Sequence, residues 1–478
     1  MKRREEPRGS RFQNNKEIYT AGAILGLLLV SLIFGLLWFE LARREETLAR
    51  PENNRYEANG DSVIRGNIET RDRVVIARTD TDNGAETRVY PFGPLFSSVT
   101  GYSAVGRTGL EASMNRYLLT SSVSFGDLIT NDLMDRKSQG DTVVTTIDSD
   151  LQHYCYELLG DRKGSITVME PRTGKVLVMV TSPTFDPNTV KENWEALTSP
   201  DNDTGILMNR CTQGLYAPGS TFKLVTAIEY MREHPDYESY HYNCTGSYTL
   251  NGETVLCGDG SGHGNVDLEH AVAYSCNAAF IDMGLSLDIG KWGALTKELG
   301  FGDKLLRELP GAASTFSLTE GSGLFEVMQT SFGQGRTMET PLENLVITSM
   351  IANGGVLVPP YLVEYVENTD GKVSERFGPS PGTRVITEEQ AAYLKRSMEA
   401  VVNYGTTPQA ASPVCQVAGK SGTAQYASSF ENMHAWFTAF APSDDPVISV
   451  TVMLEKGGYG STDAAPLARD VITYYLTR

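Results

Sequence analysis

A serine and a lysine lie three residues apart at a point where a loop ends and a helix is expected to begin. The stretch APGSTFKLV, residues 217–225, breaks at Pro218-Gly219, and an apolar stripe at helical spacing follows, which predicts a helix that opens at Ser220. The spacing puts Ser220 and Lys223 on one helix face, one turn apart. A serine hydroxyl becomes a nucleophile when an uncharged amine beside it removes its proton. Taken alone, this tetrapeptide more often represents a serine helix cap beside a solvated lysine.

Two further short motifs follow in order and favour the catalytic interpretation over the helix cap. Ser275-Cys276-Asn277 comes 55 residues after Ser220, and Lys420-Ser421-Gly422-Thr423 begins 145 residues after Ser275. Each motif is weak by itself, since Ser113-Met114-Asn115 also fits the second pattern but precedes Ser220. The ordered set Ser-x-x-Lys, Ser-x-Asn, Lys-[Ser/Thr]-Gly at domain-sized spacing is typical of penicillin-binding proteins and class A β-lactamases.

The sequence resembles the class B, monofunctional penicillin-binding protein transpeptidases. The stretches TTIDSDLQ, YAPGSTFK, HGNVDLEHAVAYSCNAAF, SFGQG, GKSGTAQ and HAWFTAFAP carry the resemblance over roughly residues 141–478, and residues 90–118 resemble the pedestal of short membrane-anchored members. The resemblance implies an α/β (α+β) fold in which helices flank an antiparallel sheet, preceded by one transmembrane helix and a small, mainly-β pedestal. Two departures are small: Cys276 stands where the motif has Asp, and Ser421 where it has Thr.

The resemblance also implies catalytic roles for individual residues. Ser220 attacks a D-alanyl-D-alanine peptide bond, and Lys223, with its pKa depressed by burial and by Lys420, takes the proton. Ser275 relays this proton to the departing D-alanine, while Asn277 holds Lys223 and the substrate amide.

Substrate binding is implied for the third motif, Ser421, Gly422 and Thr423. The backbone N–H groups of Ser220 and Thr423 would form an oxyanion hole. Lys420 and the hydroxyls of Ser421 and Thr423 would face the terminal carboxylate. The expected partners are stem peptides ending in D-Ala-D-Ala, and β-lactams that acylate the same serine.

Three other functions remain open at this point. A D,D-carboxypeptidase or a β-lactamase of the same fold would use water as the acceptor, and a non-catalytic β-lactam sensor or division scaffold would turn nothing over. Residues 41–140 leave no room for a glycosyltransferase domain, so the resemblance implies a separate membrane glycan polymerase as partner.

Composition narrows the classes of ligand. The 478-residue chain has a formal net charge of −18 with no basic stripe, which argues against a nucleic-acid partner. Its six cysteines and six histidines form no Cys-x-x-Cys or His-Glu-x-x-His pattern, so we expect neither a metal site nor a cofactor. We interpret His263 as a structural loop residue, because Lys223 already provides a base.

An uncharged apolar run at residues 18–39 follows a polar tail at residues 1–17 and is long enough to cross a membrane. Tyr19 and Trp38 lie near its ends, where amphipathic rings favour the interface. Six Lys and Arg precede the run and three follow closely, so the positive-inside rule predicts a single span with a cytoplasmic tail and an extracytoplasmic remainder.

Beyond the span, we expect a pedestal and linker at residues 40–140 and the transpeptidase domain at residues 141–478. Alternating apolar runs around Pro171–Gly174 predict a hairpin. Helices are expected within 266–300, 340–353 and 464–476, and at 387–403, where Thr387 and Glu389 suggest a capped start.

Cys244 and Cys257 lie in the segment expected outside the membrane, where thiols can oxidise. A disulfide between them would close a loop of about 14 residues and stabilise the fold by roughly 3 kcal/mol. We therefore predict a Cys244–Cys257 disulfide, with two unpaired thiols as the alternative.

Overall fold

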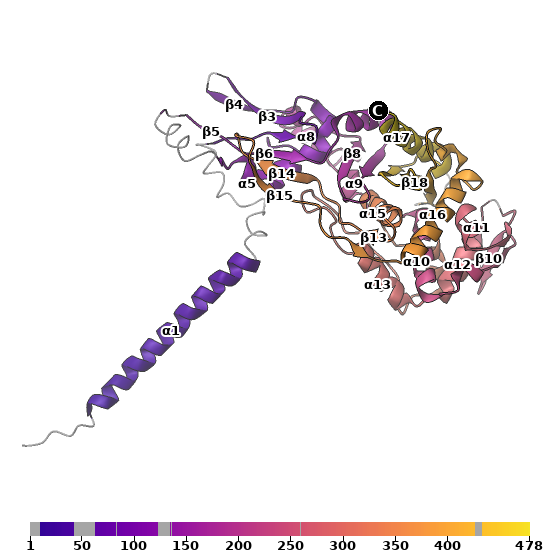
Figure 1. Cartoon of the computed structure of the whole chain (residues 1–478), viewed down its shortest axis with the longest axis horizontal. Helices are drawn as coiled ribbons and strands as arrows, with labels where there is room; N and C mark the ends of the chain where they lie inside the picture. The colour runs from indigo at the N-terminus through magenta and orange to yellow at the C-terminus, as the bar shows by residue number, and fades with distance from the viewer. Residues whose placement is uncertain are drawn as a thin grey trace, which may run out of the picture. The chain divides into compact units, whose positions relative to one another are not determined.

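The computed structural model describes residues 10–42, 63–82, 84–122, 134, 136–258, 260–425 and 433–478. The chain divides into two compact units, Met1–Ala58 and Asn59–Arg478, each described by itself. The first holds one long helix, α1 (Ser10–Ala42), drawn in indigo in Figure 1. Its segment Ile18–Phe39 has a mean hydropathy of 2.5 and no buried share, so it is long and apolar enough to span a membrane.

A six-stranded mixed sheet organises the N-terminal part of the second unit. Its strand order is β15 (Val373–Arg376), β14 (Val363–Glu367), β6 (Thr142–Thr145), β2 (Ile68–Glu69), β3 (Val75–Asp82) and β4 (Ala85–Val89). β2 and β6 pair in parallel, whereas the other neighbours are antiparallel. The sheet therefore contains strands from both sides of the domain boundary that the sequence analysis places near Asp141. The boundary itself stays a prediction.

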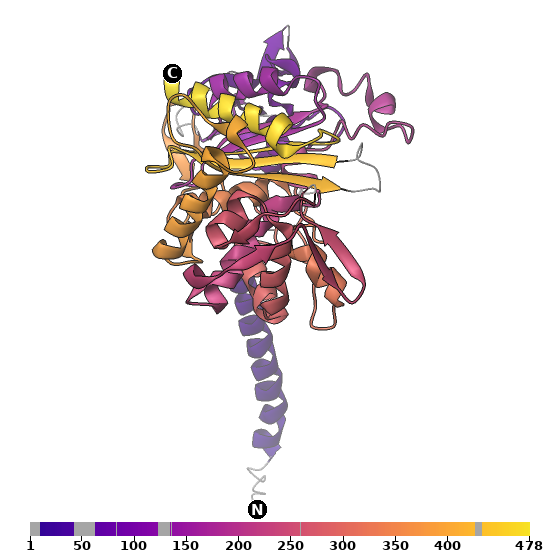
Figure 2. The same ribbon diagram turned by 90° about the vertical axis from the view of Figure 1, so that its right-hand side faces the viewer.

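A five-stranded antiparallel sheet forms the centre of the second unit. Its order is β17 (Ala418–Gln425), β18 (Met433–Ala441), β19 (Ile448–Leu454), β7 (Gly164–Met169) and β8 (Val176–Ser182). The predicted hairpin is confirmed, because β7 and β8 pair directly across the turn. Helices α7 (Ser149–Leu159) and α17 (Ala465–Thr477) cover one face and α15 (Pro341–Ala352) the other; Figure 2 shows the yellow α17 along the strands.

A helical region with its own apolar core lies next to this sheet. It contains α10 (Lys223–Glu233), α11 (Leu268–Ala273), α12 (Asn277–Ser286), α13 (Ile289–Leu299) and α16 (Glu388–Asn403). The expected helices are confirmed with small shifts of their ends. The capping box of α16 pairs Thr387 with Gln390 instead of Glu389, because the N3 position falls one residue later.

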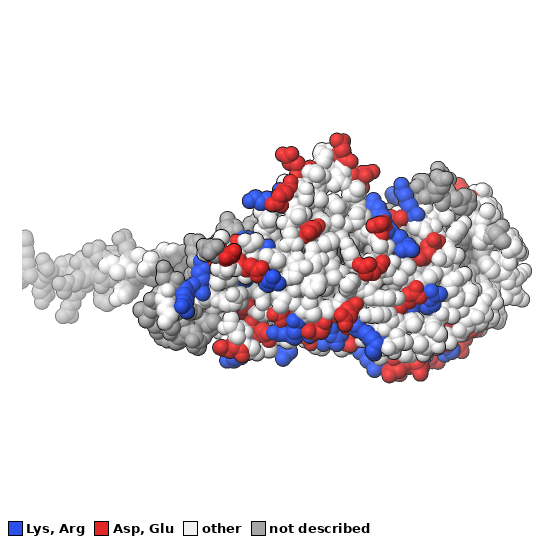
Figure 3. All heavy atoms as spheres, turned by 90° about the horizontal axis from the view of Figure 1, so that it is seen from above, with Lys and Arg blue, Asp and Glu red and all other residues white. Residues whose placement is uncertain are grey.

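Short elements complete the second unit. The paired strands are β1 (Val63–Ile64) with β5 (Ser138–Gln139), β9 (Tyr242–Cys244) with β12 (Gly264–Val266), β10 (Ser247–Leu250) with β11 (Glu253–Leu256), and β13 (Val356–Leu357) with β16 (Thr383–Arg384). The short helices are α3 (Ser97–Thr100), α4 (Gly109–Ser113), α5 (Asn115–Leu118), α8 (Trp194–Thr198), α9 (Arg210–Gln213) and α14 (Leu324–Ser331). The single turns of helix are η2 (Gly93–Phe96), η3 (Pro187–Thr189), η4 (Gly219–Phe222), η5 (Tyr237–Ser239), η6 (Pro408–Ala410) and η7 (Gly460–Ala464). On the face seen in Figure 3, acidic and basic side chains are interspersed.

Candidate active site

Ser220 lies in the 3-10 turn η4, and Lys223 begins the α-helix α10 directly after it. The helix expected to open at Ser220 is therefore correct in place, but its first turn is wound more tightly. Ser220 is half-buried, whereas Lys223 is fully buried under the helical core. Burial keeps the Lys223 amine away from bulk water.

The Lys223 amine is held by the second motif. Its Nζ donates hydrogen bonds to the carbonyl oxygen of Ser275 (2.6 Å), to Ser275 Oγ (3.1 Å) and to Asn277 Oδ1 (2.7 Å). Ser275 has a φ of +52°, a left-handed conformation in the turn between α11 and α12. This turn brings both the hydroxyl and the carbonyl of Ser275 within reach of the amine.

Lys420 reaches the same hydroxyl from the sheet. Its Nζ donates to Ser275 Oγ at 3.0 Å and to the carbonyl oxygen of Ser421 at 2.9 Å. Lys420 is fully buried in β17. Two lysine amines thus meet at one serine oxygen, and the three motifs of the sequence converge in space.

Burial decides the electrostatics of these amines. It lowers the pKa of Lys223 to about 8, while the nearby thiols of Cys257 and Cys276 act in the opposite direction. Burial together with the charge of Lys223 lowers the pKa of Lys420 well below its ordinary value. With a pKa of about 8, a fraction of the Lys223 amine is neutral near neutral pH.

Strand β17 lies against the turn that carries Ser220. A Cβ added at Gly219 would come within 2.8 Å of the Thr423 carbonyl oxygen, and one at Gly422 within 2.9 Å of the Pro218 carbonyl oxygen. Thr423 Oγ1 accepts a hydrogen bond from the Gly460 N–H at 3.3 Å. The glycines allow the strand and the turn to approach each other closely.

A family model described as "Penicillin binding protein transpeptidase domain" matches residues 164–473, and one described as "Penicillin binding protein A dimerisation domain" matches residues 65–143. The first match covers more than half of the chain. This chain belongs to the penicillin-binding protein transpeptidase family. The fold and family expected from the motifs are thereby confirmed.

Relatives with known names extend this assignment along the whole chain. Peptidoglycan D,D-transpeptidase PbpA of Mycolicibacterium smegmatis is 29% identical over 97% of this chain and 99% of its own length. Peptidoglycan D,D-transpeptidase MrdA of Haemophilus influenzae is 32% identical over 80% of this chain and 64% of its own length.

Solved structures show the same fold. The penicillin G acyl-enzyme complex of penicillin-binding protein A from M. tuberculosis superposes with a TM-score of 0.78 at 28% identity, covering 87% of this chain and all of that one. The D,D-transpeptidase domain of a peptidoglycan glycosyltransferase from Eggerthella lenta gives a TM-score of 0.78 at 29% identity, with coverages of 87% and 98%.

Two residues that sequence reasoning missed contact the third motif. Gln334 Nε2 donates to the Thr423 carbonyl oxygen at 3.2 Å, and the Thr407 hydroxyl donates to Ser421 Oγ at 2.9 Å. Gln334 lies 89 residues before Thr423 in sequence, whereas Thr407 lies 14 residues before Ser421. Gln334 lies in the stretch SFGQG, which carried part of the family resemblance, whereas no sequence signal pointed to Thr407.

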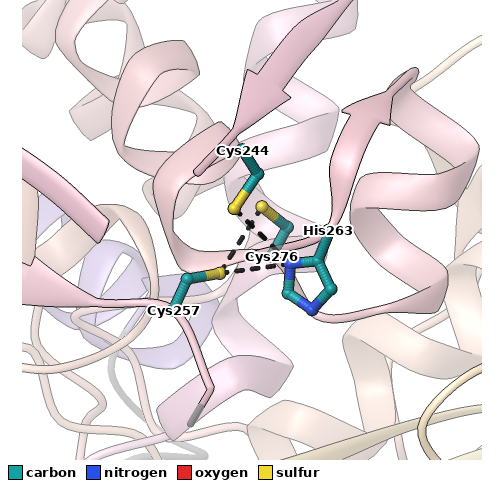
Figure 4. Close-up of side chains that lie close together, drawn as sticks. All are labelled: Cys244, Cys257, His263 and Cys276. Atoms are coloured by element: carbon teal, nitrogen blue, oxygen red, sulfur yellow. Dashed lines mark hydrogen bonds between the residues drawn. The ribbon is translucent and has the colours of Figure 1, made fainter. Parts of the chain in front are cut away.

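The predicted Cys244–Cys257 disulfide is not formed, and all six cysteines of the chain are free thiols. Cys244 and Cys257 instead lie close to His263 and Cys276 (Figure 4). The three sulfur atoms and one imidazole nitrogen all lie within 4.8 Å of one another. The expectation of no metal site did not foresee that these four residues lie close enough together to hold a metal ion. It relied on short sequence motifs, whereas the four residues come together only through the fold. His263, interpreted as a structural loop residue, belongs to this group.

Proposed function

We propose that this chain is a membrane-anchored peptidoglycan D,D-transpeptidase that works through a Ser220 acyl-enzyme. The observation that carries the proposal is the pair of amines, Lys223 and Lys420, bonded to Ser275 Oγ beside the turn that holds Ser220. Membership of the transpeptidase family and relatives named peptidoglycan D,D-transpeptidases support this reaction class.

In the acylation step, the neutral amine of Lys223 takes the proton of Ser220, and Ser220 Oγ attacks the carbonyl carbon of the penultimate D-alanine. Asn277 Oδ1 holds Lys223 in place. As the D-Ala-D-Ala bond breaks, the proton passes through Ser275 Oγ to the nitrogen of the leaving D-alanine. The products are an ester on Ser220 and one free D-alanine.

Residues of η4 and β17 would support this step. The backbone N–H groups of Ser220 and Thr423 stabilise the oxyanion that develops on the attacked carbonyl. Lys420 and the hydroxyls of Ser421 and Thr423 bind the terminal carboxylate. Gly422 permits the close approach between β17 and η4 that this arrangement requires.

The second step transfers the acyl group to the amine of a neighbouring stem peptide. The amine attacks the ester carbonyl, a new amide bond forms, and the amine's proton returns through Lys223 to Ser220 Oγ. A β-lactam follows the first step only: its ring amide acylates Ser220 and its nitrogen stays attached as part of the adduct.

Intact-mass analysis after incubation with benzylpenicillin tests the nucleophile. We expect a mass increase equal to one benzylpenicillin, and peptide mapping should locate it on Ser220. Ser220→Ala should take up no label, whereas the exposed control Ser239→Ala should label normally. Labelling at another residue would overturn the assignment.

A second assay tests whether the acyl group is transferred to an amine or to water. The chain is given a peptide donor ending in D-Ala-D-Ala together with an acceptor amine. A transpeptidase should give a cross-linked product together with free D-alanine. Hydrolysed donor alone would identify a D,D-carboxypeptidase, and rapid hydrolysis of the penicillin adduct would identify a β-lactamase. A chain that labels but turns over neither substrate would be a sensor or scaffold.

The membrane arrangement belongs to the same proposal. Residues 1–17 lie in the cytoplasm, the segment Ile18–Phe39 of α1 spans the membrane once, and the catalytic unit lies outside, where its substrate is. A reporter active only in the cytoplasm and fused after Arg478 should be silent. A membrane glycan polymerase should co-purify with the anchored chain, since the length of residues 41–140 leaves no room for a polymerase domain.

A further inference from the structure

Three thiols and one imidazole converge beside the active site from four separate places in the chain (Figure 4). Cys244 ends β9, Cys257 follows β11, His263 precedes β12, and Cys276 caps α12. Pairing of β9 with β12 and a hydrogen bond from the Cys257 N–H to the Gly246 carbonyl oxygen (2.9 Å) hold these places together. The cluster is thus part of the folded framework.

Three distances between ligand atoms in the cluster are close to the edges of a tetrahedral metal site. Cys257 Sγ lies 3.6 Å from Cys276 Sγ and 3.3 Å from His263 Nδ1, and Cys244 Sγ lies 3.6 Å from the same nitrogen. Zinc bonds of about 2.3 Å to sulfur and about 2.0 Å to nitrogen imply tetrahedral edges of about 3.8 Å and about 3.5 Å. A disulfide would instead bring two sulfurs to about 2.05 Å.

The surroundings of the sulfurs suit thiolate ligands. Cys244, Cys257 and Cys276 are at most 2% exposed. The Asn277 N–H donates to Cys257 Sγ at 3.1 Å, and the Ala279 N–H donates to Cys276 Sγ at 3.4 Å, so backbone donors stabilise negative charge on two of them. The His263 ring stacks on Tyr274, with centroids 5.7 Å apart, which fixes its orientation.

We propose that Cys244, Cys257, His263 and Cys276 bind one Zn²⁺ as a closed, structural site. Thiolate and imidazole are the ligands that zinc prefers, and four protein ligands leave no open position for catalysis. The hairpin of β10 and β11, which links Cys244 to Cys257, is largely exposed and offers little apolar core of its own. A metal ion would supply the cross-link that a small segment of this kind needs.

The site would also position the second motif of the transpeptidase. Cys276 lies between Ser275 and Asn277, whose side chains both accept from Lys223. A zinc ion bound to Cys276 would hold the turn in which Ser275 adopts its left-handed conformation. Cys244, Cys257, His263 and Cys276 are therefore positioning residues, and this second part of the inference depends on the proposed function.

Metal analysis of the full-length, detergent-solubilised chain tests the site without any substitution. Inductively coupled plasma mass spectrometry should find about one zinc per chain, and the metal-free chain should bind Co²⁺ with the visible spectrum of a tetrahedral thiolate site. A reduced chain that binds neither Zn²⁺ nor Co²⁺, a disulfide among the three cysteines, or iron in place of zinc would overturn the proposal.

Ligand variants test which residues hold the metal. Cys244→Ser and His263→Ala should lose most of the zinc, whereas Cys415→Ser, a free cysteine outside the cluster, should keep it. Circular dichroism of each variant separates loss of a ligand from loss of the fold. Full zinc content in folded Cys244→Ser and His263→Ala would contradict the assignment.

A chelator links the metal to the reaction. Removing zinc should slow acylation by a fluorescent penicillin about tenfold or more, and adding Zn²⁺ back should restore it. A chain that binds zinc but never labels would leave the metal site standing and refute the proposed function. Unchanged acylation of the metal-free chain would refute the positioning role.

Discussion

At the residue scale, the chemistry depends on two buried amines that share one hydroxyl oxygen. Lys223 and Lys420 both donate to Ser275 Oγ, and neither has access to bulk water. Two ammonium groups cannot be buried together without a large cost, so at least one amine is held neutral. In the proposed mechanism this neutral amine would be the base for Ser220, and no histidine is needed.

The lowered pKa of Lys223 predicts how acylation depends on pH. In the proposed mechanism the base is the neutral amine of Lys223, and burial lowers the pKa of this amine to about 8. The second-order rate of acylation by a fluorescent penicillin should therefore rise as the pH is raised from 6 to 8 and level off above 9.

Lys223→Arg tests the same point, because a guanidinium stays protonated at every accessible pH. Acylation should fall by about 10²- to 10⁴-fold, as expected for loss of a general base. The exposed control Lys297→Arg should behave like the unmodified chain. A rate that does not change between pH 6 and 8 would exclude Lys223 as the base that titrates.

Glu339 predicts a second pH effect, on stability. It is fully buried before α15, and burial raises its pKa to about 8. Between pH 4.5 and 8 the folded state keeps a proton that the unfolded chain has lost, so stability falls as pH rises, by up to about 1.4 kcal/mol per pH unit.

Glu339→Gln replaces the carboxyl with an amide that does not titrate, so the variant lacks this contribution to the pH dependence of stability. In urea unfolding, the stability of the variant relative to the unmodified chain should increase by about 1 kcal/mol or more from pH 5 to pH 7. The exposed control Glu320→Gln should show no such trend. A constant difference between Glu339→Gln and the unmodified chain at both pH values would contradict the buried, protonated carboxyl.

At the scale of elements, the site requires the turn η4, strand β17 and the loop after α14 to approach one another closely. Gly333 in that loop has a φ of +81°. Its carbonyl oxygen accepts a hydrogen bond from the Gly219 N–H at 2.9 Å. A Cβ at Gly333 would overlap the Gly219 carbonyl oxygen. The glycine therefore sets the position of the residue just before Ser220.

Gly333→Ala should push η4 away from this loop. We expect acylation by penicillin to fall tenfold or more and stability to fall by about 1–3 kcal/mol, because strain and overlap add. Gly371→Ala is the matched control: its φ is +76°, but an added Cβ meets nothing within 4 Å. The control should lose some stability and keep its acylation rate; equal acylation rates in both variants would contradict the argument.

At the scale of the whole second unit, one sheet joins the N-terminal part to the catalytic part. β2 pairs with β6, and β6 pairs with β14, which comes after the first two catalytic motifs in sequence. Beside this sheet, the fully buried Glu111 accepts from Arg65 Nε at 2.6 Å and from Arg88 Nε at 2.7 Å. The two parts should therefore unfold together.

Glu111→Gln tests this coupling. Burial alone raises the pKa of Glu111, but the charges of Arg65 and Arg88 outweigh it and hold the pKa at about 2. The variant leaves two buried guanidinium groups uncompensated and should lose about 3–5 kcal/mol of stability at pH 7. The loss should appear as one transition, in which penicillin labelling disappears at the same urea concentration as the circular dichroism signal.

The sign of the pH dependence follows from the lowered pKa. The stabilising contribution of Glu111 is complete above pH 4.5 and is lost as the pH falls toward 2, so the difference between variant and unmodified chain should shrink over that range. Asp80→Asn, in the exposed Arg78–Asp80 pair, should cause no measurable change. Two separate unfolding transitions in the unmodified chain would contradict the single cooperative unit.

Local patterns in the sequence determined the elements and the reacting groups. Glycine and proline breaks, apolar periodicity and the three motifs act over a few residues, so the helix beside Ser220, the hairpin of β7 and β8 and the family could be recognised from them. The sequence predicts Glu389 as the capping partner of Thr387, whereas the partner is Gln390, one residue later. Sequence patterns place helix ends only to within one or two residues.

Only the tertiary structure decided which distant groups meet. The contact of Gln334 with Thr423 spans 89 residues, and the two amines that share Ser275 Oγ lie 52 and 145 residues from it. The contact of Thr407 with Ser421 and the cluster around Cys276 span fewer residues, but they too join separate turns and strands. The spacing of cysteines along a chain does not say which sulfurs meet, because chain folding sets distances that sequence separation does not. For that reason Cys244 and Cys257 lie in a group with His263 and Cys276 and do not form the predicted disulfide.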